Sequence, residues 1–298
     1  MKIPHITVCV CTFRRPQMLK RLLAALEGQA TDARFTYSVV VTDNDRAESA
    51  RAAVAAFTEY SRLPVSYCVE QRQNIALARN TALQNANGHF MAFIDDDEFP
   101  TAEWLLNLYH TLEGYEVDGV LGPVLPHFDK EPPRWVRKGG FFNRPRHQTG
   151  LLLNWTDCRT GNVLFRAKVS ELLGEPFRNE FDCGGEDLDF FQRAITKGCR
   201  FVWCDEAIVY EVQEPSRWKV RLMMRRALLR GRNNWKFTQG RWLRLSKSAV
   251  ALPFYTLSLP IMLLGGYHRF VKSLVRIGDH GGKVLAALEL NPVRTRNP

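Results

Sequence analysis

One short stretch of the sequence decides the fold of this chain, Ile94-Asp95-Asp96-Asp97-Glu98-Phe99. An apolar run at 90–94, rich in the aromatic and branched residues that strands favour, leads directly into its three consecutive aspartates. A strand that stops on carboxylates brings them out at the carboxyl edge of its sheet, where open α/β sheets bind ligands. Adjacent carboxylates repel one another. The run therefore indicates a compensating Mg²⁺ or Mn²⁺ with substrate phosphates or, as the simpler alternative, a solvated acidic turn.

The first hundred residues alternate between short apolar runs and helical patterns. The strand-like runs are 6–12, 39–42, 65–69 and 90–94, and the helical patterns between them cover 18–26, 46–60 and 76–86. Strands that alternate with helices of this length indicate βαβ units and a largely parallel sheet. Thr12, Asp43 and the triple aspartate then share one rim of the sheet, which favours the metal and phosphate interpretation over the solvated turn.

Five short motifs occur along the chain in a recognisable order. They are Cys11-Thr12-Phe13-Arg14-Arg15, Asp43-Asn44, Ala78-Arg79-Asn80, Ile94-Asp95-Asp96-Asp97 and Gly184-Gly185-Glu186-Asp187-Leu188-Asp189. Together, over residues 3–215, they resemble the motifs of family 2 glycosyltransferases of the GT-A fold. One departure is Asn74-Ile75-Ala76, where many members have glycine two residues after the asparagine. The resemblance implies a Rossmann-like α/β fold with a mixed, mostly parallel sheet flanked by helices, and a nucleotide-sugar donor.

The resemblance also implies roles on the donor side. Asp43 is expected to accept a hydrogen bond from the base N–H, with a turn or helix N-cap as the alternative. Thr12 is expected to contact the nucleotide, or else to act as a local cap. Arg79 is expected either to hold the nucleotide or diphosphate or to be a solvated helix residue. The predicted nucleotide-sugar-binding residues are Thr12, Arg15, Asp43, Arg79, Asp95 and Asp96.

The triple aspartate resembles the family's Asp-x-Asp motif. In that arrangement Asp95 faces the ribose, and Asp97 binds a divalent metal, Mn²⁺ or Mg²⁺, that stabilises charge on the departing nucleotide. No His or Cys ligand is expected, because the seven His are scattered without an HExxH pattern and the seven Cys form no CxxC pair.

Asp187 is the residue that the resemblance makes the general base, because an inverting transfer needs a carboxylate to take the proton of the attacking hydroxyl. The preceding Gly184 and Gly185 allow the backbone to approach a substrate closely. Glu186 and Asp187 at a helix start interact favourably with the helix dipole. The dipole also lowers the pKa of a carboxyl group, so burial must raise that pKa again if the carboxylate is to act as a base. The alternative is that these two acids serve the dipole alone.

The stretch 126–147 lies between these motifs. It is rich in Pro, Arg and aromatic residues, carries little secondary-structure signal, and is predicted to be a functional loop. Because aromatic rings stack on sugar faces, we expect Trp135 on the acceptor side; a packed surface flap is the alternative. The Thr160-Gly161-Asn162 step resembles the family's turn beside the acceptor, so Asn162 and Glu186 complete the predicted acceptor-side residues.

Charge divides the chain into two parts. Of 298 residues, 45% are hydrophobic, enough for one sizeable core and an appendage. Residues 1–214 hold 24 Lys and Arg against 29 Asp and Glu, a net of −5, whereas 215–278 hold 14 Lys and Arg and no acid. We predict a catalytic domain at 1–214, with the nucleotide-sugar half at 1–100 and the acceptor half at 101–214, and a helical tail at 215–298.

The tail is predicted to associate with a membrane. Its first part, 217–235, interleaves basic residues with Trp, Leu and Met, which suits an anionic membrane surface. The next part, 248–267, is uncharged over twenty residues, near the length that spans a bilayer. Pro253 and Pro260 interrupt it, and positive charge flanks both ends. These features favour a re-entrant or interfacial hairpin; a buried helical pair packed on the catalytic domain is the alternative.

The leading hypothesis is an inverting, metal-dependent glycosyltransferase, a hexosyltransferase. By analogy it moves a sugar from a UDP-sugar to a membrane-linked saccharide in exopolysaccharide or cell-envelope glycan synthesis, and its tail resembles those of small bacterial exopolysaccharide transferases. The chain begins with a strand rather than a signal peptide, and its odd number of cysteines lacks framework spacing. We therefore expect it at the cytoplasmic face of the plasma membrane.

Other functions remain as alternatives. A nucleotide transferase of the same fold is disfavoured, because its glycine-rich basic loop is replaced by Thr12-Phe13-Arg14-Arg15-Pro16. The sequence pI near 9.4 suggests a nucleic-acid-binding protein, but basic charge confined to a tail beside an apolar run fits lipid better, so no nucleic-acid partner is expected. A non-catalytic membrane scaffold is the third alternative.

Overall fold

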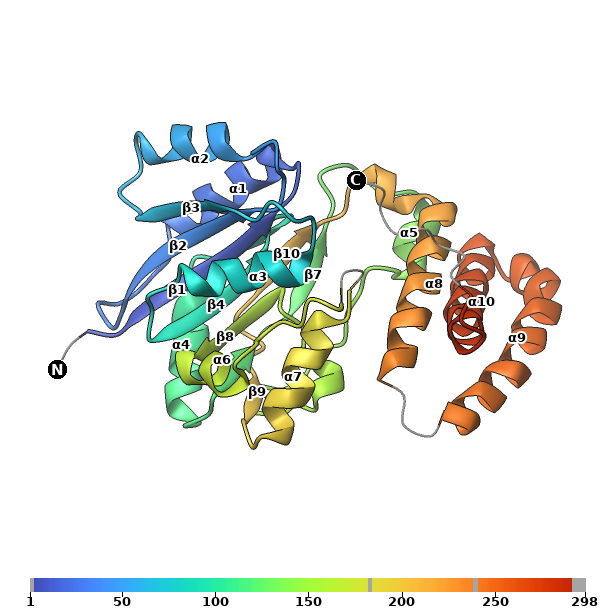
Figure 1. Ribbon diagram of the computed structural model, residues 1–298. Helices are drawn as coiled ribbons and strands as arrows, with labels where there is room; N and C mark the ends of the chain where they lie inside the picture. Colours follow the sequence, from blue (N-terminus) through green and yellow to red (C-terminus); the bar gives the residue numbers. More distant parts are fainter. Residues whose placement is uncertain (1–2, 182–183, 238–240, 291–298) are drawn as a thin grey trace. The chain divides into compact units, whose positions relative to one another are not determined.

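The computed structural model describes residues 3–181, 184–237 and 241–290. The chain divides into two compact units (Figure 1). Unit 1 comprises residues 1–126 and 144–211, and unit 2 comprises residues 127–143 and 212–298. The main boundary thus lies close to the one expected from charge, but the segment 127–143 groups with the C-terminal part. The division into a catalytic domain and a tail stays a prediction.

The first half of unit 1 consists of strands and helices in strict alternation. They are β1 (His5–Thr12), α1 (Pro16–Glu27), β2 (Thr36–Asp43), α2 (Arg51–Thr58), β3 (Val65–Val69), α3 (Ile75–Gln84) and β4 (Phe90–Asp95). The four strands pair in parallel in the order β3-β2-β1-β4. The predicted βαβ units are therefore confirmed.

The second half of unit 1 adds antiparallel strands. Its elements are β5 (Glu98–Pro100), α4 (Trp104–Gly114), β6 (Gly119–Leu121), β7 (Val124–His127), a 3-10 turn at Trp155–Asp157, β8 (Asn162–Arg166), α6 (Ala167–Leu173), α7 (Glu186–Thr196), β9 (Phe201–Trp203) and β10 (Val209–Val212). Strand β8 runs antiparallel between β4 and β6, and β9 closes a seven-stranded sheet. A smaller sheet has the order β5-β10-β7. The mixed, mostly parallel sheet flanked by helices is confirmed.

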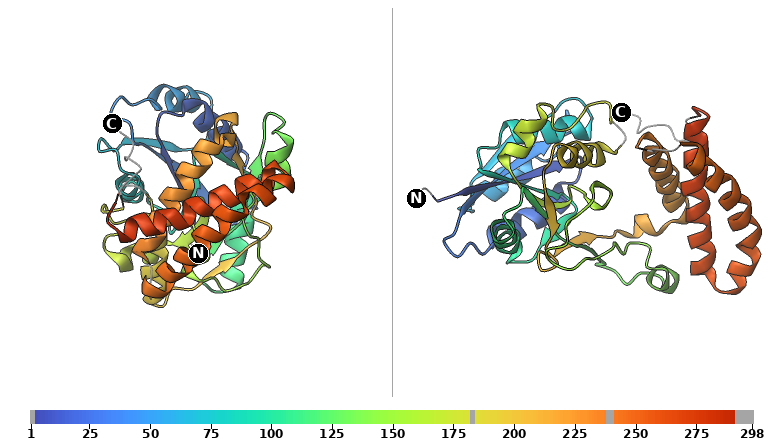
Figure 2. Two further views of the ribbon diagram at one scale, coloured as in Figure 1. Left: turned by 90° about the vertical axis from the view of Figure 1, so that its right-hand side faces the viewer. Right: turned by 90° about the horizontal axis from the view of Figure 1, so that it is seen from below.

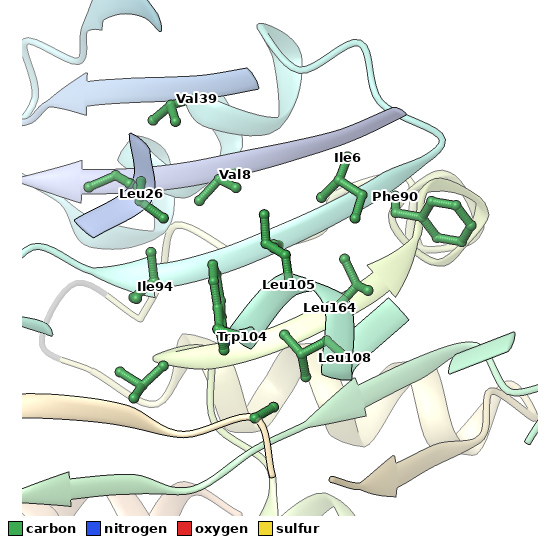
Figure 3. Close-up of a cluster of buried hydrophobic side chains, with 14 of the residues drawn as sticks. Ile6, Val8, Leu26, Val39, Phe90, Ile94, Trp104, Leu105, Leu108 and Leu164 are labelled. Carbon is green, nitrogen blue, oxygen red and sulfur yellow. The ribbon is translucent and has the colours of Figure 1, made fainter. Parts of the chain in front are cut away.

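Buried side chains fill both faces of the larger sheet. Because successive strand residues point to opposite faces, Val8 and Cys9 of β1 enter different clusters. One cluster packs the sheet against α1 and α4, with Leu26, Ile94 and Trp104 among its members (Figure 3). The other packs α3, α6 and α7 onto the opposite face. Covering both faces explains why the strand sequences are apolar throughout.

Two elements differ from the sequence expectation. Helix α2 begins at Arg51 rather than near residue 46, because the Asp43 carboxylate accepts hydrogen bonds from the N–H groups of Asp45 and Ala50 and holds the chain between them in a loop. The stretch 126–147, expected to be a loop, contains the helix α5 (Arg134–Gly139). Pro133 precedes this helix and Gly140 ends it with a left-handed φ of 54°, the usual Pro and Gly asymmetry of helix ends.

Unit 2 is helical. Besides α5 it contains a 3-10 turn at Pro215–Trp218, α8 (Val220–Lys236), α9 (Arg241–Leu264) and α10 (Tyr267–Ala287). Gly265 and Gly266 reverse the chain between α9 and α10, and α10 packs between α8 and α9 (Figure 2). Within the described residues α9 is the one helix long and apolar enough to cross a membrane, over Leu245–Leu264. Only 6% of that segment is buried. The interfacial hairpin and the helical pair packed on the catalytic domain both stay predictions.

Candidate active site

The carboxyl ends of the three parallel strands β1, β2 and β4 bring the predicted donor residues together. Thr12, at the end of β1, lies beside Asp43 at the end of β2, and Cys11 lies beside Asp95 at the end of β4. The Thr12 hydroxyl donates a hydrogen bond of 2.8 Å to the Asp96 carboxylate. The predicted gathering of these residues on one rim of the sheet is confirmed.

Arg15 neutralises part of the triple aspartate. Its Nη1 donates to Asp96 Oδ1 at 2.9 Å and lies 3.0 Å from Asp97 Oδ2. Asp96 and Asp97 are buried, whereas Asp95 is half-exposed. Burial raises the pKa of Asp96 to about 6, although the charge of Arg15 acts in the opposite direction. Because two of the three aspartates are buried and held by side chains, the solvated acidic turn does not describe this site.

Asp43 is fully buried and its carboxylate is already engaged. The oxygens accept hydrogen bonds from the N–H groups of Asp45 and Ala50 and from the Tyr67 hydroxyl, at 3.0, 2.7 and 3.0 Å. These contacts correspond to the turn-and-cap alternative of the sequence interpretation. The hydrogen bond to a nucleotide base stays a prediction for this residue.

Arg79 joins the two carboxylate motifs. The side chain is buried on α3; Nη1 donates to Glu186 Oε1, and Nη2 lies 3.6 Å from Asp95 Oδ1. Its guanidinium carbon also lies over the Phe177 ring, 5.6 Å from the ring centroid, within the limit of about 6 Å for a cation–π contact. Burial acts to lower the pKa of Arg79, but the carboxylates of Glu186, Asp95 and Asp187 outweigh it and raise that pKa. The alternative of a solvated helix residue is therefore wrong.

The predicted base lies at the first turn of α7. Gly184 and Gly185 adopt φ values of 99° and 102°, which favour glycine, and the helix begins at Glu186. Asp187 is partly exposed; its Oδ1 accepts from the Leu188 N–H at 2.8 Å and its Oδ2 lies 3.8 Å from Arg159 Nε. Of the two adjacent acids, Asp187 is thus the one that a hydroxyl can reach.

Glu186 has a different environment from its neighbour. It is buried against Arg79, and within the described residues its second oxygen, Oε2, has no hydrogen-bond partner. Burial raises its pKa, with the charge of Arg79 acting in the opposite direction and that of Asp187 adding to the rise. Glu186 therefore fits a role in orienting Arg79 better than a direct role in proton transfer. Its predicted acceptor-side contact stays a prediction.

From the sequence, no role was assigned to Glu98, Arg144 or Glu211. Glu98 is buried, and its Oε2 accepts from the Asp95 N–H at 2.9 Å, which fixes the turn of the triple aspartate. Burial, then the charge of Asp95, raises the pKa of Glu98 well above its usual value, while Arg144 opposes this. Arg144 itself pairs with Glu211 of β10 at 2.6 Å. The only sequence signal was that Glu98 continues the acidic run; Arg144 and Glu211 are distant in sequence.

The two other acceptor-side predictions occupy different surroundings. Asn162 is buried in β8: it accepts from Trp104 Nε1 at 2.8 Å and donates to the carbonyl groups of Pro123 and Ala207. A sugar would have to compete with these interior partners. Trp135 lies in α5 of unit 2, with its ring 5.3 Å from that of Tyr267. Contacts of either residue with an acceptor stay predictions.

The donor set at the rim fits a hard divalent cation. Within the described residues no three His, Cys, Asp or Glu side chains converge as in a site built wholly from protein ligands. Mg²⁺ and Mn²⁺ nevertheless bind through one or two carboxylates together with water and substrate phosphates. The half-exposed Asp95 and the Asp97 oxygen that now faces Arg15 supply such carboxylates. Arg15 already neutralises part of the negative charge of Asp97, so a cation at Asp97 would compete with Arg15 for this carboxylate.

Comparison with known proteins gives three consistent findings. The family profile described as glycosyl transferase family 2 matches residues 7–174. The succinoglycan biosynthesis protein ExoM of Rhizobium meliloti (strain 1021) is 35% identical over 234 residues, which cover 77% of this chain and 74% of that protein. The glycosyltransferase AglE of Haloferax volcanii is 28% identical over 69% of this chain and 66% of that protein.

Among solved structures, S. aureus TarS (residues 1–349) in complex with UDP-GlcNAc superimposes with a TM-score of 0.57. The match covers 97% of this chain and 93% of that one at 14% sequence identity, and shows a shared GT-A-like fold. The expected fold class is therefore confirmed by an independent structure.

Proposed function

Because the chain belongs to glycosyl transferase family 2, we propose that this enzyme moves a sugar from a UDP-sugar to a membrane-linked saccharide, with inversion at the anomeric carbon. The acceptor we propose is an intermediate of exopolysaccharide assembly. The likeness to a succinoglycan biosynthesis protein supports this acceptor, and the complex of the structurally similar TarS with UDP-GlcNAc supports the donor.

One observation carries the proposal: the buried Arg79 contacts both Asp95 at the donor rim and Glu186 beside the predicted base. The donor motif and the base motif are more than ninety residues apart in sequence, yet one guanidinium connects them. Such a link would keep the base at a fixed position relative to a sugar bound at the strand ends, and an in-line displacement requires this alignment.

In the proposed reaction Asp187 accepts the proton of the acceptor hydroxyl as that oxygen forms a bond to the anomeric carbon. The bond from this carbon to the terminal phosphate oxygen breaks, and the nucleoside diphosphate leaves with the electron pair. The Leu188 N–H and the Arg159 guanidinium contact the Asp187 carboxylate and orient it.

The residues of the rim would hold the donor. Thr12 and Arg15 orient Asp96 and Asp97, and Glu98 fixes the backbone of Asp95. The family is typically metal-dependent, and a bound Mn²⁺ or Mg²⁺ at Asp97 would supply Lewis-acid stabilisation of the leaving diphosphate. Arg15 contacts Asp97 in the structure; once displaced by the cation, its guanidinium would be available to pair with the same phosphates.

A location at the cytoplasmic face of the membrane is supported by α9 and by the charge of the tail. Helix α9 exposes apolar side chains over most of its length. The residues from 215 to 278 carry positive charges without any acid. Together these features favour contact with an anionic membrane that carries the acceptor.

The experiment that tests the function combines binding and transfer. Calorimetric titration with UDP in Mn²⁺ and then in EDTA should show metal-dependent binding. The Asp187→Asn variant should keep that affinity but lose transfer from a UDP-sugar by about 100-fold or more, because only the proton acceptor is removed. Asp32→Asn, an exposed position before the start of β2, is the matched control and should behave as the unmodified enzyme. Metal-independent or absent UDP binding, or near-normal transfer by Asp187→Asn, would contradict the proposal.

A further inference from the structure

Helix α9 carries an unpartnered apolar stripe. Val250, Phe254, Leu257, Ile261 and Leu264 are 65–90% exposed. Their spacing of four, seven, eleven and fourteen residues from the first places them on one face of the helix. A row of large apolar side chains so exposed marks an interaction surface rather than an ordinary protein surface. The stripe therefore needs an apolar partner that the helices of unit 2 do not supply.

The opposite face of α9 packs on α10 and includes polar side chains. Ser248 Oγ lies 3.0 Å from His280 Nδ1, and the Tyr255 ring lies 6.0 Å from the His280 ring at an interplanar angle of 29°. Arg276 donates to the Tyr255 hydroxyl at 3.3 Å. The two helices run side by side in both views (Figures 1 and 2). One side of α9 thus packs on α10 through hydroxyl, imidazole and guanidinium groups, which are poorly solvated in hydrocarbon.

Helix α10 is held in turn by α8. Asp279 accepts from Arg230 at 2.8 Å. The glycines let the two backbones approach closely: a Cβ at Gly282 would lie 2.2 Å from the Leu228 carbonyl oxygen, and one at Gly278 would lie 2.8 Å from the Ala227 Cβ. Because α10 is fixed between α8 and α9 and is charged along its length, α9 does not enter a bilayer without carrying charges with it.

The backbone of α9 gives a second argument against a span. Pro253 and Pro260 lie inside the helix and are exposed. Each lacks the N–H that would pair with the carbonyl four residues earlier, at Ala249 and Thr256. Hydrocarbon offers no substitute donor to these carbonyls, whereas water and headgroups at an interface do.

The charges near the stripe define the lipid. Lys247 near the start of α9, and Arg269 and Lys272 at the start of α10, are exposed. No Asp or Glu occurs between residues 215 and 278. Cations that flank an apolar face match a bilayer surface with anionic headgroups.

We infer that α9 lies in the plane of an anionic bilayer surface, with its apolar stripe among the acyl chains and its opposite face on α10, and that it does not cross the membrane. This inference rests on the proposed function, which places the acceptor in a membrane, and adds the segment, the face and the mode of attachment. The partner is a lipid surface, not a second copy of the chain.

The test measures co-flotation of the full chain with vesicles. Binding to phosphatidylcholine vesicles with 30 mol% phosphatidylglycerol should exceed binding to pure phosphatidylcholine. Leu257→Glu should weaken it by about tenfold or more, since it removes the most central apolar group of the stripe. Thr256→Glu adds the same charge to the same helix away from the stripe and should bind within about twofold of the unmodified chain. Ile261→Ser provides a second, milder variant, and circular dichroism checks that each variant is folded.

Alkaline carbonate extraction of cell membranes separates the two modes of attachment. An in-plane helix should be released at pH 11, and a spanning helix should stay in the membrane, which would overturn the inference. Equal binding by Leu257→Glu and the unmodified chain would also overturn it. The inference would also be overturned if light scattering showed a dimer that forms without lipid and that Leu257→Glu dissociates, because the stripe would then be buried between two copies of the chain.

The outcome is separable from that of the proposed function. Metal-dependent UDP binding and transfer to a soluble acceptor should be unchanged in Leu257→Glu. If vesicles fail to bind the unmodified chain while UDP binding persists, the attachment is wrong and the catalytic proposal stands. If UDP binding fails, the catalytic proposal falls whatever the vesicles show.

Discussion

Replacement of Arg79 by Met tests the buried link between the donor rim and the base. Methionine keeps a flexible apolar stem and removes the charge together with the N–H donors of the guanidinium. In the intact protein Arg79 and Glu186 are both buried and paired, and Arg79 is 3.6 Å from Asp95. Without the guanidinium, Glu186 would be left as a buried carboxylate without an opposite charge, and Asp95 would lose its neighbouring cation.

The expected cost follows from this burial. Removal of one partner of a buried ion pair costs about 3–5 kcal/mol, because the other charge stays desolvated. That is a large part of the 5–15 kcal/mol typical of a domain. Burial already raises the pKa of Glu186, and loss of Arg79 raises it further. A carboxyl with a raised pKa in the folded state stabilises the fold below its unfolded pKa, and this contribution is lost as pH rises through the folded value. The cost should therefore be smaller at pH 5 than at pH 8.

The assay is urea-dependent hydrogen exchange of α3 and α7, followed by mass spectrometry, which reports on unit 1 alone. A double-mutant cycle of Arg79→Met and Glu186→Gln should give a coupling free energy above about 1 kcal/mol. Arg51→Met, which removes one partner of an exposed pair with Glu48, is the matched control and should change the stability far less than Arg79→Met does. An additive cycle, or a cost for Arg79→Met that does not change with pH, would refute the reasoning.

Three further predictions concern the rim. Asp97→Ala should abolish the dependence of UDP affinity on Mn²⁺ in calorimetry; equal affinities with metal and with EDTA in the unmodified enzyme would remove the ligand assignment. Burial raises the pKa of Asp96 to about 6, so protonation of Asp96 should stabilise the fold by up to about 3 kcal/mol below about pH 4, and this stabilisation should be lost as pH rises through 6. In urea titrations in EDTA, Asp96→Asn should therefore reduce the dependence of the unfolding free energy on pH. An unchanged dependence would assign it to another group. A Cβ at Gly161 would lie 2.8 Å from Glu98 Oε1, so Gly161→Ala should destabilise unit 1 by about 1–3 kcal/mol in thermal unfolding. The control is Gly28→Ala, which has open space around it and should be nearly neutral in the same assay.

The sequence was most informative where local pattern and chain direction suffice. Alternation of apolar runs and helical patterns predicted the parallel strands, and parallel strands necessarily share their carboxyl edge, so Thr12 and Asp95 could be placed together without a structure. The start of α7 at Glu186 agrees with what the resemblance to the family's Glu-Asp motif implied. The missed helix α5 carried a Pro and Gly signal at its ends that the richness in aromatic residues obscured.

The partners of individual charges were not predictable in the same way. Arg79 could have been solvated or engaged with substrate, and the structure instead buries it between Glu186 and Asp95. Asn162 was expected beside a sugar and is bonded to Trp104 within the core. In both cases the deciding neighbours lie tens of residues away, so no local pattern specifies them.

By itself, the sequence determined the fold class, the common rim of Thr12 and the triple aspartate, and the separation of a basic, apolar tail, because each depends on periodicity, strand direction or charge counted along the chain. Only the tertiary structure decided which carboxylates are compensated by Arg15 and Arg79, that Asp187 rather than Glu186 is accessible, and that α9 exposes one apolar face. Burial and charge pairing depend on distances between segments far apart in sequence, and those distances are set when the sheet and helices pack.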